Sequence, residues 1–131
     1  MSFGPNVFGI NGKSLDQDHD SIDGEPFEDV YETAFTLDTT GPRITRHRPS
    51  GDNAGTVEYV DVWFSEAINP SSFTTSGVSI TGPSGNITPS AVAENGFNCY
   101  RVSFPAQTAF GEYHFEVRPN IEDPVGNIMD Q

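Results

Sequence analysis

Alternating acidic residues in one short stretch of the chain could bind a hard divalent cation. Residues 16–32 carry eight of the nineteen acidic residues, and Asp16, Asp18 and Asp20 occupy positions 1, 3 and 5 of the stretch. Ca²⁺ takes about six to eight oxygen ligands, so carboxylates at alternate loop positions can turn several oxygens towards one ion. The spacing therefore predicts a Ca²⁺-binding loop at residues 16–29.

The other ligands of this loop are predicted from its similarity to a calcium-loop template. Position 7 is Ile22, which would offer its backbone carbonyl while its side chain points into a core. Position 6 is Ser21 rather than Gly and position 12 is Phe27 rather than Glu, so the loop is a variant that needs another closing carboxylate. The alternative is a solvated acidic linker whose charges keep it extended. The candidates for the closing carboxylate are Glu25, Glu28 and Asp29. The predicted ligands are therefore Asp16, Asp18, Asp20, Ile22, Glu25, Glu28 and Asp29.

The segment before this loop is repeated at the end of the chain. Residues 5–17 align without gaps on residues 119–131, with five of the thirteen positions identical. A match at one fixed offset, here 114 residues, is typical of a repeat of domain size. The chain therefore resembles one full repeat preceded by the tail of another, and Asp130 is the counterpart of Asp16, the first carboxylate of the loop.

Length and charge limit the class of protein. The chain has 131 residues, a formal net charge of −13 and only six Lys and Arg residues, which argues against nucleic acid as a partner because phosphate binding needs a cationic surface. No stretch approaches the about 20 apolar residues of a membrane span, and no signal peptide is visible at residues 1–4. The lone Cys99 excludes an intrachain disulfide.

Period-2 patterns and turn residues indicate an all-β fold. In residues 56–65, Val60, Val62 and Phe64 would face a core while Asp61 and Trp63 face outward. Further strands are expected, separated by Gly- and Pro-rich turns that favour a β-sandwich. These strands are residues 43–48, 77–81, 86–93 (interrupted by Pro89), 97–104 and 111–118.

A further alternating segment lies between the acidic loop and the sandwich. Residues 31–38 read as a strand with Phe35 and Leu37 on the face that also carries Tyr31. The Gly41-Pro42 pair then punctuates the chain. We therefore expect an N-terminal extension at residues 1–41 and a β-sandwich at residues 42–131.

From Asp38 onward the chain resembles the bacterial Ig-like repeats found in tandem in large surface and secreted proteins. The likeness rests on the order and spacing of five short segments, namely 38–42 (DTTGP), 60–66 (VDVWFSE), 72–80, 111–117 (GEYHFEV) and 121–127 (IEDPVGN). It implies a Greek-key immunoglobulin-like β-sandwich that serves as a spacer or adhesive module rather than an enzyme. The acidic segment before it is similar to the calcium loops of EF-hand and dockerin proteins.

The chain departs from this family in the place of the final strand. Such repeats close with a strand like residues 31–37, and here that strand lies ahead of the sandwich. Residues 43–131 alone would leave a sheet edge uncovered, which invites another strand. The segment could fold back on its own sandwich, complete a neighbouring copy head-to-tail, or belong to a longer array. The rigid linker before Pro42 favours the second arrangement.

Other candidate sites have ordinary alternatives. Trp63 could stack on a sugar ring or pack against a neighbouring repeat. The basic residues of segment 43–48 could meet the acidic loop of a neighbour or form a solvated strand face. Asp38 and Asp123 flank the predicted joint and could supply oxygens to a metal there. The three histidines lack metal-type spacing, and no catalytic motif is present.

The sequence thus predicts a calcium-stiffened, immunoglobulin-like structural module of an extracellular or cell-surface bacterial fibre or adhesin. Its partners would be copies of itself or neighbouring repeats, joined head-to-tail through donation of residues 31–38. The alternative is a carbohydrate-binding accessory module of a secreted hydrolase.

Overall fold

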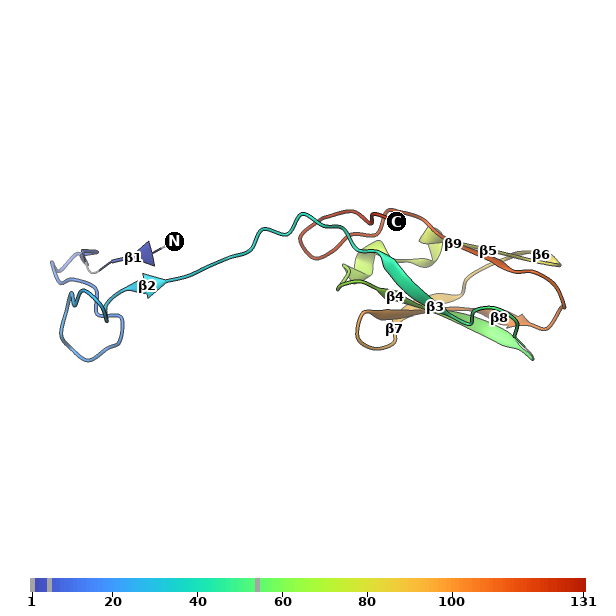
Figure 1. Ribbon diagram of the computed structural model, residues 1–131, viewed down its shortest axis with the longest axis horizontal. Coiled ribbons are helices and arrows are strands. Elements are labelled where there is room, and N and C mark those ends of the chain that lie inside the picture. Colours follow the sequence, from blue (N-terminus) through green and yellow to red (C-terminus); the bar gives the residue numbers. More distant parts are fainter. Residues whose placement is uncertain (1, 5, 54) are drawn as a thin grey trace. The chain divides into compact units, whose positions relative to one another are not determined.

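The computed structural model describes residues 2–4, 6–53 and 55–131. The chain divides into two compact units, Met1–Leu37 and Asp38–Gln131, and Figure 1 follows the chain through both. The second unit begins four residues before the expected boundary, so it includes residues 38–41. No helix in the described part of the chain is long and apolar enough to cross a membrane.

The second unit is a β-sandwich built from two antiparallel sheets (Figure 1). The four-stranded sheet has the order β3-β4-β8-β7, and the three-stranded sheet has the order β6-β5-β9. The bounds of the strands are Ile44–Arg48 (β3), Val57–Phe64 (β4), Val78–Gly82 (β5), Gly85–Ile87 (β6), Ala91–Glu94 (β7), Cys99–Gln107 (β8) and His114–Val117 (β9). The all-β sandwich predicted from the alternating patterns is confirmed.

The core lies between the sheets and follows the period-2 pattern. Val62 on β4 and Val102 on β8 are fully buried, and the register of the two strands makes them near neighbours, since Val60 pairs with Val102 and Val62 with Tyr100. Phe73 packs edge-on against Phe64, with ring centroids 5.6 Å apart. Burial of such side chains supplies most of the stability of a small sandwich.

The connections explain where the predicted strands end. The segment expected as one strand at residues 86–93 is two strands in different sheets, β6 and β7, because Pro89 lies where the chain crosses from one sheet to the other. Asn69 caps a 3₁₀ turn at Pro70–Ser72 (η1) by accepting a hydrogen bond from Ser71 N–H. A second 3₁₀ turn, Thr75–Gly77 (η2), leads into β5.

A hairpin loop at residues 121–130, the closing hairpin, seals the sandwich. Glu122 bridges Ile128, and the carbonyl oxygen of Ile121 accepts a hydrogen bond from Met129 N–H at 2.7 Å. Ile121 and Met129 are buried in the core. The hairpin is held to the rest of the unit by backbone hydrogen bonds from Asn69 N–H to the Glu122 carbonyl, 2.7 Å, and from Asp130 N–H to the Pro42 carbonyl, 3.2 Å.

The N-terminal unit contains one small sheet, in which β1 (Ser2–Phe3) pairs with β2 (Tyr31–Glu32). The strand expected over residues 31–38 is therefore only two residues long. Strand β1 is equally short, and the two strands pair Ser2 with Glu32 and Phe3 with Tyr31. The side chains of Phe35 and Leu37 are 83% and 80% exposed.

The sequence repeat is also a structural repeat. In the N-terminal unit Phe8 bridges Ser14, and 114 residues later Glu122 bridges Ile128. The hydrogen bond from Gly9 N–H to the Lys13 carbonyl, 2.9 Å, has its counterpart between Asp123 and Asn127, 3.0 Å. Both turns also place a glycine with positive φ at the same position, Gly12 (75°) and Gly126 (95°). Residues 6–17 thus form a second hairpin of the same kind, the leading hairpin.

Candidate metal centre

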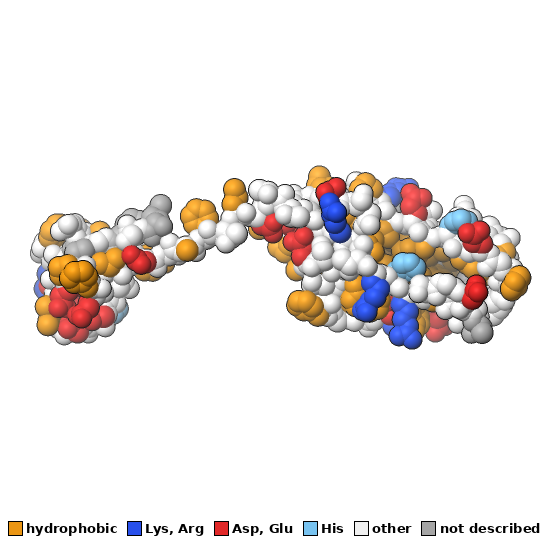
Figure 2. Space-filling view, viewed as in Figure 1, with side chains coloured by type: hydrophobic (Ala, Val, Ile, Leu, Met, Phe, Trp, Pro, Cys, Tyr) orange, Lys and Arg blue, Asp and Glu red, His pale blue; other side chains and the backbone are white. Residues whose placement is uncertain are grey.

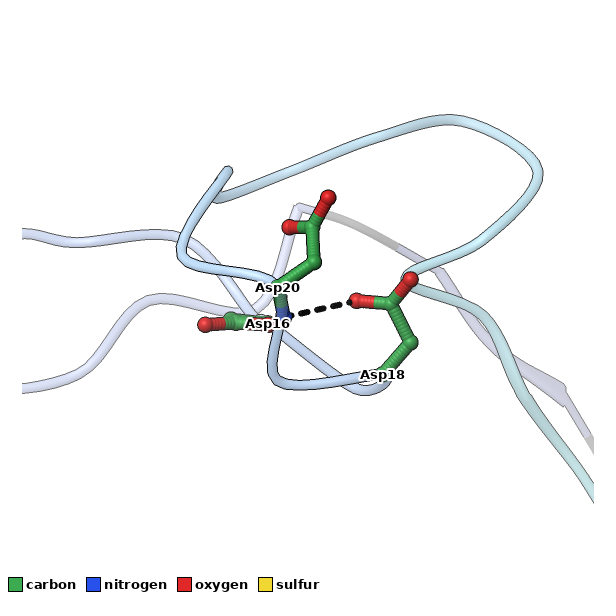
Figure 3. A group of neighbouring side chains, drawn as sticks. All are labelled: Asp16, Asp18 and Asp20. Carbon is green, nitrogen blue, oxygen red and sulfur yellow. Dashed lines mark hydrogen bonds between the residues drawn. The ribbon is translucent and has the colours of Figure 1, made fainter.

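The acidic loop brings alternate carboxylates together. One oxygen of each of Asp16, Asp18 and Asp20 lies within 4.8 Å of the others. Figure 3 shows the three side chains on one curled stretch of the loop. The loop curls because Asp18 Oδ1 accepts a hydrogen bond from Asp20 N–H at 3.2 Å and Asp20 Oδ1 accepts one from Ile22 N–H at 2.7 Å. Such side-chain turns are typical of Asp and replace regular secondary structure.

A second group of oxygens shares one member with the first. Asp18, Glu25 and Glu28 also offer oxygens within 4.8 Å of one another. Burial, together with the charges of Glu28, Asp20 and Asp18, raises the pKa of the Glu25 carboxyl above its usual value. Five of the seven predicted ligands therefore lie in two adjoining groups, and Figure 2 shows the acidic side chains gathered on this unit.

Two carboxylate oxygens in these groups are buried but have no hydrogen-bond partner in the described chain. Asp16 Oδ1 and Glu25 Oε2 are inaccessible to solvent and accept no hydrogen bond within the described chain. Buried polar atoms are normally satisfied, so each such atom calls for an explanation such as a bound ion. Lys13 is the only Lys or Arg in the sequence of residues 1–37, and its Nζ pairs with Asp23 instead, 2.9 Å from a carboxylate oxygen. The donor set therefore fits a hard divalent cation.

Asp29, the remaining predicted carboxylate ligand, belongs to neither of these two groups. Its carboxylate is fully buried and accepts hydrogen bonds from the backbone N–H groups of Gln17, Gly24 and Glu25. Burial alone would raise the pKa of Asp29, but the backbone N–H groups outweigh it and hold the pKa below its usual value. The Asp29 carboxylate thus holds the end of the loop against its start at Gln17. The Ile22 side chain, expected in a core, is exposed.

A third acidic group lies within the sandwich unit. Oxygens of Asp38, Glu66 and Asp123 lie within 4.8 Å of one another. The buried Asp123 is fully hydrogen bonded: Oδ1 accepts from Val125 and Asn127 N–H, and Oδ2 from the Asn127 side chain, at 2.8–2.9 Å. Burial and the charges of Asp38 and Asp123 raise the pKa of Glu66. Sequence spacing suggested Asp38 and Asp123 but gave no signal for Glu66.

The remaining candidate residues lie on the four-stranded sheet. The guanidinium of Arg46 lies 3.9 Å from the Trp63 ring centroid and covers one face of the ring that a sugar would use. An open hollow of about 350 Å³ beside them is lined by Arg46, His47, Arg48 and Trp63 among others. Cys99 is buried, and burial raises the pKa of its thiol, which makes it a poor nucleophile.

Comparison with known proteins identifies the fold but no family. No family model matches the sequence, and no curated protein matches it significantly. Two solved structures are similar: the N-terminal part of the bacterial S-layer protein SbsC and the S-layer protein rSbsC(31-844). Each gives a TM-score of 0.54 and 16% identity over 70% of this chain. The chain matches only 22% and 12% of their respective lengths, so the likeness shows the fold of one part of them.

Proposed function

We propose that the chain is a structural module of a bacterial cell-surface or extracellular assembly rather than an enzyme. Its fold is shared with part of an S-layer protein, and its best-formed clusters of side chains suit cation binding and packing. The observation that carries the proposal is an open sheet edge in a chain whose alternating segment at residues 31–38 exposes the apolar side chains of Phe35 and Leu37.

The open edge belongs to β9. This strand pairs with β5 along one side, and no other strand of the described residues pairs with its second side. Phe115 and Val117 on β9 are only partly buried although they pack against the core. An unpaired edge beside a partly open core is a site for strand addition, in which backbone hydrogen bonds supply affinity and alternate side chains supply specificity.

The donor of that strand is residues 31–38 of a neighbouring module. Phe35 and Leu37 alternate with polar residues and are exposed in the N-terminal unit, as a strand with one apolar face requires. If the neighbour is a second copy of this chain, each copy both gives and receives a strand. Such head-to-tail contacts generate open filaments.

Ca²⁺ at the acidic loop stiffens the donor segment. The ligands would be Asp16, Asp18, Asp20, Glu25 and Glu28, with the backbone carbonyl of Ile22. Bound Ca²⁺ would neutralise the crowded carboxylates and give the unpartnered oxygens of Asp16 and Glu25 a ligand role. A stiffened loop fixes the direction in which the strand leaves it, which lowers the entropy cost of docking.

Assembly of the purified chain tests the proposal. Sedimentation velocity at rising protein concentration in Ca²⁺ should show oligomers of increasing size. Phe35→Asp should leave the chain monomeric, because a carboxylate cannot enter the sandwich core. Phe97→Asp is the matched control, since Phe97 is also highly exposed, at 91%, and lies in the turn before β8 of the other sheet. A Phe35→Asp variant that assembles like the wild type, or a wild type that stays monomeric throughout, would refute strand donation in trans.

A further inference from the structure

The two hairpins have the same backbone bonds but different surroundings. Ile121 in the closing hairpin is 2% exposed, whereas its counterpart Val7 in the leading hairpin is 47% exposed. Met129 is buried in the core, whereas its counterpart Leu15 is only partly buried. The leading hairpin therefore carries apolar side chains at the positions that are buried in the sandwich unit, but the described residues of its own unit form no sandwich around them.

The sandwich unit shows what seats such a hairpin. The η1 turn donates Asn69 N–H to the Glu122 carbonyl, and the Pro42 carbonyl accepts Asp130 N–H. Gly41 lies against the carbonyl of Ile128, where any side chain would collide. A hairpin of this kind thus fits between a Gly-Pro segment and an Asn-capped turn. Within the described N-terminal unit, the only sheet is β1–β2 and no 3₁₀ turn is present.

The leading hairpin, the acidic loop and the strand sequence after it form one connected piece. Gly24 N–H donates to the Leu15 carbonyl at 2.8 Å. The buried carboxylate of Asp29 accepts a hydrogen bond from Gln17 N–H at the end of the hairpin. The loop is therefore folded back on the hairpin rather than extended as a linker. Whatever receives the hairpin also fixes where the following strand begins.

We infer that residues 6–37 are the closing segment of a preceding module in a 114-residue tandem repeat, and that their partner is a sandwich of the same kind. This inference rests on the proposed strand donation and names its receiver. The leading hairpin seats on the receiver's counterparts of Pro42 and η1, and residues 31–37 cover its counterpart of β9. The acidic loop then lies within one module, between its closing hairpin and its final strand, rather than at a joint between two modules.

Continuing the repeat in register tests this inference directly. Gln131 is the counterpart of Gln17, so a copy of residues 18–38 appended after Gln131 supplies the segment that the sandwich of this chain should accept. The matched control carries the same extension with Phe35 and Leu37 of the appended copy changed to Asp. Both chains retain the complete original sequence, so folding of the sandwich itself is not at risk.

The extension with the unchanged copy of residues 18–38 should cover the edge of β9. Hydrogen exchange of the outward-facing amides of His114–Val117 should slow by about tenfold or more, because strand amides exchange only on opening. The unfolding temperature should rise by several degrees, and the chain should remain monomeric. The Asp-containing control should behave like the original chain. Equal exchange at β9 in the two extended chains would overturn the inference.

The result is separable from the test of assembly in trans. Protection of β9 by the extension, with an original chain that never assembles, supports the in-register closing segment and rejects exchange between copies. Assembly of the original chain, with no protection by the extension, rejects the closing segment and leaves donation between copies standing.

Discussion

Gly41 lies directly against the carbonyl oxygen of Ile128, so closely that a Cβ atom on Gly41 would overlap that oxygen. The contact joins the first residues of the sandwich unit to its closing hairpin, which is 87 positions further along the chain. Gly41 and Pro42 are both buried. The Gly41-Pro42 pair, which the sequence indicates only as a boundary between two parts of the chain, is therefore part of the packed structure.

Gly41→Ala should destabilise the sandwich. A methyl group at this position forces the backbone of the closing hairpin to move, and overpacked positions typically lose about 1–3 kcal/mol. Urea unfolding followed by Trp63 fluorescence measures the change. Gly77→Ala is the control, because a Cβ there meets nothing within 4 Å. Equal stability of the two variants would show that the hairpin yields without cost.

Phe73→Ala should be among the most damaging core substitutions. Its ring packs edge-on against Phe64 and Tyr100, at centroid distances of 5.6 and 5.8 Å. Removing a buried Phe ring leaves a cavity and typically costs about 3–5 kcal/mol. The exposed Phe97 provides the comparison, and Phe97→Ala should change the free energy of unfolding by less than about 0.5 kcal/mol. A small loss at Phe73 would mean that the core collapses into the space.

The strands were predictable where burial alone decides the pattern. Val62 on β4 and Val102 on β8 face the core, and the alternation of apolar and polar residues along each strand is enough to predict this. Asp61 follows the same alternation outward but is buried, because Arg101 on β8 binds it with two hydrogen bonds of 2.7 and 2.8 Å. That partner is 40 residues away, so local pattern could not reveal it.

The acidic loop was predictable in part. Alternate spacing correctly brings Asp16, Asp18 and Asp20 together, because short side-chain turns are local. The role of Asp29 depends on where the backbone N–H of Gln17 ends up, which is a tertiary property. The length of β2 likewise depends on its partner β1 rather than on its own alternation.

Changing Asp16, Asp18 and Asp20 together to Asn should abolish Ca²⁺ binding at the loop. Each substitution replaces a charged oxygen pair with a weaker neutral ligand, while size and turn geometry are preserved. Isothermal calorimetry should lose the heat of Ca²⁺ binding, and the backbone amide signals of Ile22 and Gly24 should cease to shift with Ca²⁺.

The control for this variant removes three exposed charges outside the loop, by Asp52→Asn, Glu58→Gln and Glu116→Gln. It changes the net charge equally and should leave the calorimetric heat intact. Loss of binding in both triple variants would assign the effect to overall charge rather than to the loop.

Ca²⁺ affinity should fall as pH decreases from neutral into the acidic range, because protons and Ca²⁺ compete for Glu25, whose pKa is raised. A raised folded-state pKa also means that the metal-free loop is stabilised as pH falls through that value and destabilised as pH rises. Ca²⁺ titrations over this range measure the competition. Glu25→Gln should bind more weakly at neutral pH but show a shallower pH dependence. An unchanged slope would place the titrating group elsewhere.

The leading hairpin also shows how the closing hairpin could form without Asp123. Gly9 stands at the position of Asp123, and Asn11 Oδ1 accepts the Lys13 N–H that corresponds to Asn127 N–H. The double substitution Asp123→Gly with Val125→Asn transfers this arrangement to the sandwich. It should retain more stability at neutral pH than Asp123→Ala, which leaves the Asn127 N–H without its acceptor.

The same double variant should respond less to acid. Burial opposes ionisation of Asp123, but hydrogen bonds from Asn127 and Val125 outweigh it and lower the pKa of the carboxyl. Because the folded-state pKa is lowered, the ionised Asp123 stabilises the wild type at pH values above the ordinary pKa of 3.8. This stabilisation is lost as pH falls through the folded-state pKa. Replacing Asp123 removes that loss and also one of the charges that raise the pKa of Glu66. Acid unfolding followed by Trp63 fluorescence should therefore be shallower in the double variant, and an identical acid transition would show that Asp123 does not control it.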